Sequence, residues 1–276
     1  MFIGVLTIIL FPYSSNHYGI RMEQETHMID LYPMICKRKS FHVFSKGENL
    51  SETELQMVQN QCAELGVLVK DIKTRFKIVP IAETTCRRGE YCILAYSEHK
   101  PNYLQNIGYM LAQLDLWLAF CNIGSCWYGM GKSFETKYGE LDFVIMMAIA
   151  KQDEQSFRKD VSKTRRKPVE HIWQGLERPK IADVIRYAPS ACNSQPWNII
   201  SEADTLRIYR LTEKRGILPA GKAAYYHQID IGIFLLYVEL CLQHEAISFI
   251  RNLYLQEKTQ HGYLSAEYRL LQHTMS

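Results

Sequence analysis

The chain has 276 residues, of which 47% are hydrophobic and 22% charged, and its formal net charge is +3. These values are typical of a folded globular protein, so they exclude wholesale disorder and give no basis for a nucleic-acid or acidic-membrane partner. Eight cysteines are too few for a disulfide scaffold in so long a chain, and none forms a C-x-x-C pair. We therefore expect reduced thiols, a cytoplasmic protein and no metal site.

The amino-terminal run 2–11 is apolar, but it is too short to span a bilayer and no basic region precedes it. No clean small-residue cleavage site follows it. Met22 and Met28 both lie just before the first amphipathic pattern. We predict that residues 1–27 are a mis-assigned start or a loose arm. A signal peptide is the second interpretation and a membrane anchor the third.

Helical and extended patterns then alternate along the first part of the chain. Apolar spacing predicts a short helix over 29–37, and Ser51 with Glu54 forms a capping box that begins a second helix. A long helix over 103–121 is apolar almost all round and is expected to be buried. Runs of β-branched, aromatic or continuously apolar residues predict strands over 76–81, 91–96 and 143–150.

A charged connector, residues 151–167, separates this pattern from a second and similar one. After the connector, the sequence predicts helices over 169–174 and 180–187, strands that begin at Trp197 and Leu206, and a long apolar helix over 226–244.

The two long apolar helices match at a fixed spacing. Asn106-Ile107-Gly108 aligns with Asp230-Ile231-Gly232 at an offset of 124 residues (230 − 106), and at the same offset Asp115 meets Glu239. A repeat this long indicates two homologous half-domains rather than a solenoid. We predict a first half over residues 28–167 and a second half over residues 168–276.

The most distinctive stretch is 188–197, A-P-S-A-C-N-S-Q-P-W. By its chemistry alone it is an ordinary helix-to-strand turn, whose short polar side chains bond local backbone or a planar polar ligand. The pattern A-P-S-x-x-N-x-Q-P-W, however, resembles the signature loop of the nitroreductase family of FMN-dependent oxidoreductases. The likeness covers roughly residues 28–250 and is to the fused, divergent nitroreductases of the thermophile type. It implies an α+β, nitroreductase-like fold. Family members are homodimers that bind FMN between subunits, so two halves in one chain imply a single-chain pseudo-dimer.

The resemblance places complementary parts of one cofactor site in the two halves. In the first half, residues 38–42 (R-K-S-F-H) are similar to the family's R-x-S-x-R/K element, which faces the phosphate and the N1/O2 edge of the flavin. His42 replaces the usual second cation, so the charge there depends on pH. The second half has the P-S-x-x-N loop but no R-x-S-x-R element. The first half has the R-x-S-x-R-like element but no P-S-x-x-N loop. We infer one working FMN site and one lost site.

Two further segments complete the predicted site. Residues 163–170 (K-T-R-R-K-P-V-E) resemble the basic tail that returns to the phosphate in many nitroreductases, although such a charge run is otherwise a solvated face. Residues 124–131 stand where the family has a loop over flavin N5, and glycines there let the backbone approach a flat ring. The acidic residue usual in that loop is not evident. The predicted cofactor-binding residues are Arg38, Lys39, Ser40, His42, Gly129, Met130, Arg165, Arg166, Pro189, Ser190, Ala191 and Asn193.

The family resemblance also implies a ping-pong mechanism, in which NADH or NADPH gives hydride to flavin N5 and FMN then reduces a small acceptor such as a nitroaromatic or a quinone. The predicted residues bind the cofactor, and none is assigned acid–base chemistry. Two alternatives stay open: a flavin-binding protein for storage or sensing, and a decayed enzyme fold used for interaction. The expected partner is a small-molecule substrate, with no nucleic acid and no membrane. The expected assembly is a monomeric fused pseudo-dimer or a weak homodimer.

Overall fold

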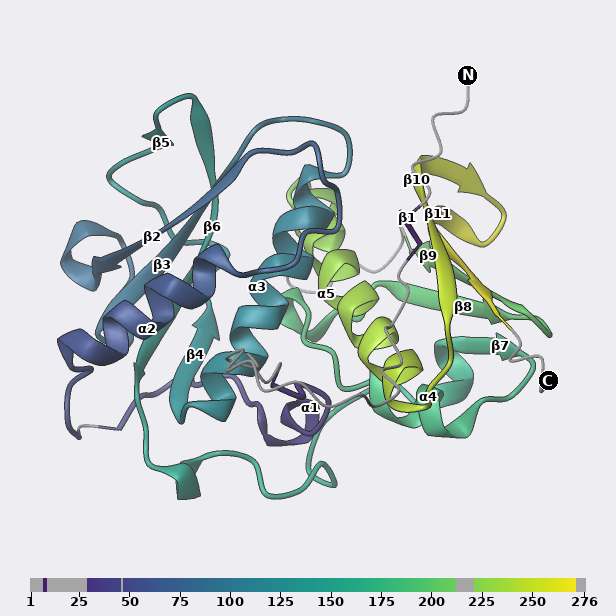
Figure 1. Ribbon diagram of the computed structural model, residues 1–276, viewed down its shortest axis with the longest axis horizontal. Helices are drawn as coiled ribbons and strands as arrows, with labels where there is room; N and C mark the ends of the chain where they lie inside the picture. Colours follow the sequence, from purple (N-terminus) through teal and green to yellow (C-terminus); the bar gives the residue numbers. More distant parts are fainter. Residues whose placement is uncertain (1–6, 9–28, 46, 212–220, 272–276) are drawn as a thin grey trace, which may run out of the picture.

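The structure, a computed structural model, describes residues 7–8, 29–45, 47–211 and 221–271. Two β-sheets stand on either side of a pair of central helices (Figure 1). Apart from Thr7–Ile8, which form strand β1, the segment 1–27 lies outside the described residues, so the prediction for it stays a prediction.

The first sheet is antiparallel throughout, with strand order β2-β3-β6-β4 and with β5 paired to β6. The predicted strands at 76–81, 91–96 and 143–150 are confirmed, and β4 is an additional edge strand where a loop was expected. Gly124 lies within β4 and leaves room for two side chains: a Cβ there would be 2.5 Å from Gln152 Cγ and 3.0 Å from Phe41 Cδ2. The strands are β2 Thr74–Pro80, β3 Tyr91–Ser97, β4 Ile123–Trp127, β5 Lys137–Tyr138 and β6 Leu141–Lys151.

The second sheet has the order β1-β10-β11-β9-β8-β7, in which only the β7–β8 pair is parallel. Its strands are β7 Trp173–Gly175, β8 Trp197–Ser201, β9 Thr205–Arg210, β10 Phe249–Thr259 and β11 Gly262–Leu270. The helix predicted over 169–174 is wrong: a single 3₁₀ turn, Val169–His171, leads into β7. Trp173 is buried in register with Ile199, and Gly175 ends the strand at a φ of +89°. The β10–β11 hairpin has no counterpart among the predicted elements.

The helices are α1 Met34–Lys37, α2 Glu52–Ala63, α3 Tyr103–Phe120, α4 Pro179–Ile185 and α5 Ala223–His244. α1 is shorter than predicted because Pro33 precedes it, and a proline disfavours the helical conformation in the residue before it. Among the described residues, no helix is both long enough and apolar enough to cross a membrane.

The predicted capping box of α2 is confirmed. The Glu54 N–H donates to Ser51 Oγ at 3.2 Å, and the Ser51 N–H donates to Glu54 Oε2 at 2.8 Å. Replacing Ser51 with alanine is expected to lower the free energy of unfolding by about 1 kcal/mol. Urea denaturation followed by circular dichroism measures this loss, and an unchanged midpoint would contradict it.

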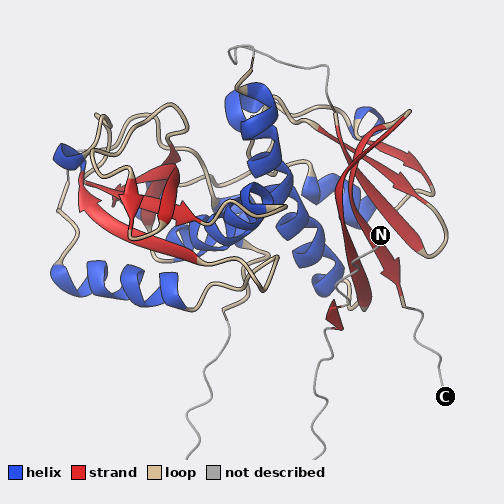
Figure 2. Ribbon diagram, turned by 90° about the horizontal axis from the view of Figure 1, so that it is seen from above, coloured by secondary structure: helices blue, strands red, loops and turns tan. Residues whose placement is uncertain are grey.

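The central helices α3 and α5 pack directly on each other between the two sheets (Figure 2). A Cβ on Gly108 would lie 2.1 Å from Ile229 O, and a Cβ on Gly232 would lie 1.9 Å from Gln105 O. The backbones therefore approach this closely because neither glycine has a side chain. The offset of 124 relates one contact to the other, since it maps Gln105 onto Ile229 (229 − 105) and Gly108 onto Gly232 (232 − 108).

The matched acids of these helices are also buried, and each holds an arginine. Arg38 Nε donates to Asp115 Oδ2 at 2.8 Å, and Arg251 forms an ion pair with Glu239. Asp115 Oδ2 also accepts from Trp127 Nε1 at 2.8 Å. Trp127 and Arg251 each follow the acid by twelve residues (127 − 115 and 251 − 239). The sequence repeat is thus accompanied by a repeated contact between a helix acid and the strand that follows it.

Candidate functional site

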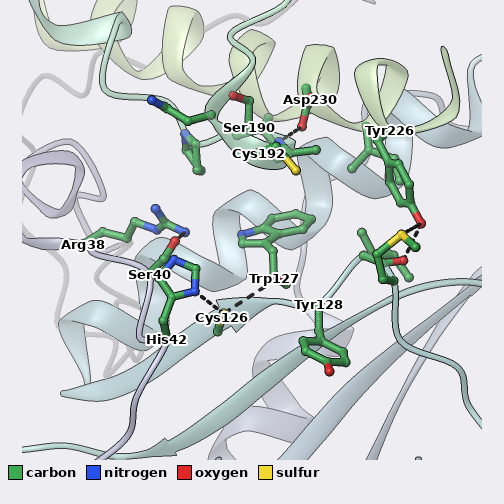
Figure 3. Close-up of a pocket in the computed structure, with 18 of the residues that line it drawn as sticks. Arg38, Ser40, His42, Cys126, Trp127, Tyr128, Ser190, Cys192, Tyr226 and Asp230 are labelled. Carbon is green, nitrogen blue, oxygen red and sulfur yellow. Dashed lines mark hydrogen bonds between the residues drawn. The ribbon is translucent and has the colours of Figure 1, made fainter. Parts of the chain in front are cut away.

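A cavity of about 680 Å³ lies beside the central helices, a size typical of small-molecule sites. One wall comes from the segment after α1, from β4 and the turn that follows it, and from the connector after β6. The opposite wall comes from the loop 189–193 and from α5. Figure 3 shows Arg38, Ser40 and His42 on one side of this cavity, Tyr226 on the other, and Trp127 between them.

Ten of the twelve predicted cofactor-binding residues line this cavity: Arg38, Ser40, His42, Gly129, Met130, Arg166, Pro189, Ser190, Ala191 and Asn193. Lys39 and Arg165 do not. The Lys39 ammonium donates to the Ser156 carbonyl and lies 4.6 Å from the centre of the Phe41 ring, and the Arg165 side chain is exposed. Around Ser40, which bridges to Ser125, the chain runs extended, so alternate side chains face opposite ways. This alternation turns Lys39 away from the cavity.

Arg38 is held rigidly in the first wall, where only 2% of it is exposed. Besides its bond to Asp115, its guanidinium donates through NH2 to Ser40 Oγ at 3.1 Å. Asp115 also accepts from the Ser125 hydroxyl and from Trp127 Nε1. A single buried carboxylate therefore fixes both a cation and the indole ring that lies between the two walls.

The loop of the second wall and the basic connector form one bonded unit. Asn193 Oδ1 accepts from Arg166 NH1 at 2.9 Å, and Asn193 Nδ2 donates to Arg165 O at 3.0 Å. The Lys167 N–H donates to Gln195 Oε1 at 2.8 Å. Cys192, Asn193 and Gln195 all have left-handed backbone conformations, with φ of 51°, 54° and 47°. Asparagine tolerates this conformation, and here its amide also positions Arg166 in the cavity wall.

Four arginines line the cavity, and three of them, Arg38, Arg158 and Arg166, form a cluster in which the charges of Arg38 and Arg158 act on Arg166. Burial, followed by the charges of Arg38 and Arg158, lowers the pKa of Arg166 to about 10, and burial and Arg38 lower the pKa of Arg158. Within the described ranges, Arg158 and Arg166 form no ion pair, and Arg158 NH1 and Arg166 Nε lack hydrogen-bond partners. Buried cationic donors are costly without a partner, so this part of the wall can accept an anionic ligand.

At the far end, the turn after β4 is tied to α5. The Tyr226 hydroxyl donates to Gly129 O at 2.5 Å, and a Cβ on Gly129 would lie only 3.0 Å from Tyr226 Cε1. On the side of the cavity that holds His42, Arg88 lies over the Tyr128 ring, 5.8 Å from its centre, with Nη1 3.1 Å from His42 Nδ1. The turn after β4 is therefore flanked by aromatic and polar side chains, and the Tyr226 contact ties its backbone to α5.

Several lining or supporting residues were not among the predicted ones, namely Arg88, Asp115, Trp127, Arg158, Tyr226 and Asp230. Asp115 and Asp230 did carry a signal, because each is an acid inside an otherwise apolar helix. Arg158 carried none, since its position depends on the path of the connector: the Arg158 N–H donates to Lys37 O at 3.0 Å.

Comparison with known proteins identifies the chain's relatives. A family model described as "Putative TM nitroreductase" matches residues 30–242. Among solved structures, a "putative nitroreductase" from Thermotoga maritima MSB8 matches with a TM-score of 0.56 and 17% sequence identity, over 92% of this chain and 98% of that chain. At this identity the match shows a shared mixed α+β fold. A search of curated proteins finds no significant match. Because the family model covers most of its length, the chain belongs to this nitroreductase family.

Proposed function

We propose that the protein is an FMN-dependent oxidoreductase that takes electrons from NADH or NADPH and passes them to a small acceptor, such as a nitroaromatic or a quinone. The observation that carries this proposal is the charge of one cluster in the cavity wall, formed by Arg38, Arg158 and Arg166 and distinct from the Arg88 guanidinium. Arg38, Arg158 and Arg166 bring three positive charges, and Asp115, paired with Arg38, offsets one of them. The remaining two match the charge of a phosphate monoester, which is about −2 near neutral pH.

The other lining groups fit the rest of FMN. Guanidinium donors and the Ser40 hydroxyl suit the phosphate, while Trp127 and the apolar side chains Ile145, Ile229 and Ile233 offer flat and apolar walls. When bound, FMN would supply the hydride and electron-transfer chemistry. The protein's own residues bind and orient it and exclude water.

We further propose that the chain is a fused pseudo-dimer with halves 28–167 and 168–276 and one site between them. The reciprocal glycine contacts of α3 and α5 and the repeated acid-to-strand contact support this proposal. The proposed assembly is a monomer or a weak homodimer. The eight cysteines are all unpaired, which agrees with a proposed location in the reducing cytoplasm.

The test is the visible absorption spectrum of the purified protein after addition of FMN and desalting, followed by NADH or NADPH without oxygen. We expect flavin bands that survive desalting and are bleached by one or both nicotinamides. Bands that survive without bleaching would indicate a storage or sensing protein instead. Loss of the bands on desalting would overturn the cofactor assignment.

Replacing Arg158 with alanine tests directly whether the positive charge of the arginine cluster binds the FMN phosphate. Loss of a charge-assisted hydrogen bond costs about 1.5–3 kcal/mol, so FMN affinity is expected to fall about 10–100-fold. Arg165 provides the matched control, because its side chain is exposed outside the cavity, and its replacement by alanine is expected to change affinity less than about twofold. Fluorescence titration with FMN measures both. If both replacements changed FMN affinity equally, the phosphate would not bind at the arginine cluster.

A further inference from the structure

Asp230 is a buried acid whose second carboxylate oxygen has no partner. It lies on α5 in the cavity wall, behind the loop that carries Ser190 and Cys192 (Figure 3). Its Oδ1 accepts from the Ala191 N–H at 2.9 Å. The residue is 3% exposed, and neither its Oδ2 nor the neighbouring Ser194 hydroxyl has a partner within hydrogen-bond geometry among the described residues, although the two groups lie near enough to interact. An ionised oxygen in such a place costs stability, and a proton or a ligand in the cavity would remove this cost.

Asn106, at the equivalent position of α3, shows what the structural role requires. Its Oδ1 accepts from the Leu68 N–H at 2.8 Å and from the Val69 N–H at 3.0 Å, so it holds the backbone of the preceding loop as Asp230 holds Ala191. A neutral amide is therefore sufficient for this task. The amide at 106 is away from the cavity, whereas the acid at 230 lines it. Of these two equivalent positions, only the one that lines the cavity carries a carboxyl group.

The surroundings of Asp230 favour the protonated form of its carboxyl group. Burial raises the pKa of Asp230 to about 8, although the Ala191 N–H and the nearby Ser194 hydroxyl oppose this. Burial, Arg210 and Lys167 lower the pKa of His227 to about 4, so this neighbour on α5 is neutral near pH 7. The other titratable groups that line the cavity with Asp230 are Tyr226 on α5, Cys192 on the loop, His42, Cys126 and Tyr128 on the opposite wall, and the guanidinium groups of Arg38, Arg88, Arg158 and Arg166.

We propose that Asp230 holds a proton at Oδ2 and delivers it to the electron acceptor in this cavity, an inference that rests on the proposed function. Reduction of a quinone to a hydroquinone adds two electrons and two protons. Both electrons and one proton arrive as the hydride equivalent that the proposed function provides. For the second proton, the O–H bond at Oδ2 breaks and an O–H bond forms on the quinone oxygen. Asp230 is left as a carboxylate, and water reprotonates it.

The variant Asp230→Asn keeps an acceptor for the Ala191 N–H but has no proton to give. After bleaching with NADH or NADPH, reoxidation by 1,4-benzoquinone, which needs a proton, is compared with reoxidation by ferricyanide, whose reduction needs none. We expect the quinone rate to fall about 100-fold and the ferricyanide rate to change less than about twofold. The exposed Asp183→Asn variant is the control and is expected to match the wild type in both.

Equal slowing with both acceptors would indicate a structural role and overturn the proposal, as would an unchanged quinone rate. Flavin retention and bleaching by nicotinamide are read in the same samples. Their failure in the wild type would overturn the proposed function and is thus distinct from a failure of the Asp230 assignment.

A second readout uses the FMN-free protein. The folded state keeps the Asp230 proton up to about pH 8, whereas the unfolded state loses it near pH 3.8. Between these values the unfolded state binds fewer protons, so the stability of the wild type falls as pH rises. The Asp230→Asn variant lacks this contribution, so its stability relative to the wild type should rise steadily across the window. Parallel curves would show an ionised carboxyl and overturn the proposal.

Discussion

Replacing Gly232 with alanine is expected to lower the free energy of unfolding by about 3 kcal/mol or more. The added methyl carbon would lie 1.9 Å from Gln105 O, and in Gly108→Ala it would lie 2.1 Å from Ile229 O. In both cases the obstructing atom belongs to the backbone of the neighbouring helix, so no change of side-chain rotamer relieves the clash. α3 and α5 would have to move apart, which disturbs the core that they share with both sheets.

Urea denaturation of the FMN-free variants measures this loss. Gly47→Ala is a suitable control, because a Cβ there meets nothing within 4 Å and its φ is not in the left-handed region. Its stability should stay within about 1 kcal/mol of the wild type. If Gly232→Ala unfolded at the same denaturant concentration as Gly47→Ala, the close approach of the two helices would be refuted.

Replacing Arg38 with alanine is expected to have two effects at once. It leaves Asp115 buried without its cation, which costs about 3–5 kcal/mol of unfolding free energy. It also removes a guanidinium from the cavity wall, so FMN affinity should fall about 100-fold under the proposed function. Thermal unfolding reports the first effect, and a fluorescence titration with FMN at a temperature where the variant is folded reports the second.

Arg251→Ala separates these effects, because Arg251 holds the matched acid Glu239 outside the cavity. Its stability loss should lie in the same range, since Glu239 keeps the Tyr109 and Tyr268 donors as Asp115 keeps Ser125 and Trp127. FMN affinity of the folded variant should be unchanged. Equal losses of affinity in both variants would mean that Arg38 acts only through stability.

The sequence predicted those elements whose signal is local. The capping box of α2, the apolar helices α3 and α5 and the continuous apolar run of β6 each form where the pattern placed them. The motif segments also came together, since ten predicted residues line one cavity. The two that do not, Lys39 and Arg165, neighbour residues that do. A motif indicates which segment meets the cavity, but the direction of each side chain depends on the local backbone.

The elements that were missed depend on distant partners. β7 has three residues and exists because it pairs with β8, so its own sequence carries little information. β11 does alternate, with Leu264, Ala266, Tyr268 and Leu270 buried, but it lies beyond the region of family resemblance. Arg158 reaches the cavity only because the connector docks on the end of α1.

Both walls of the cavity belong to one polypeptide, since the connector after β6 runs from the wall that holds Arg38 to the loop that holds Asn193. Dilution therefore cannot separate them. A site shared between two subunits loses occupancy as the subunits dissociate, whereas this one keeps the same intrinsic affinity for its ligand at any protein concentration. Under the proposed pseudo-dimer, covalent linkage would also free each half to diverge, because a substitution in one wall would no longer be copied into the other.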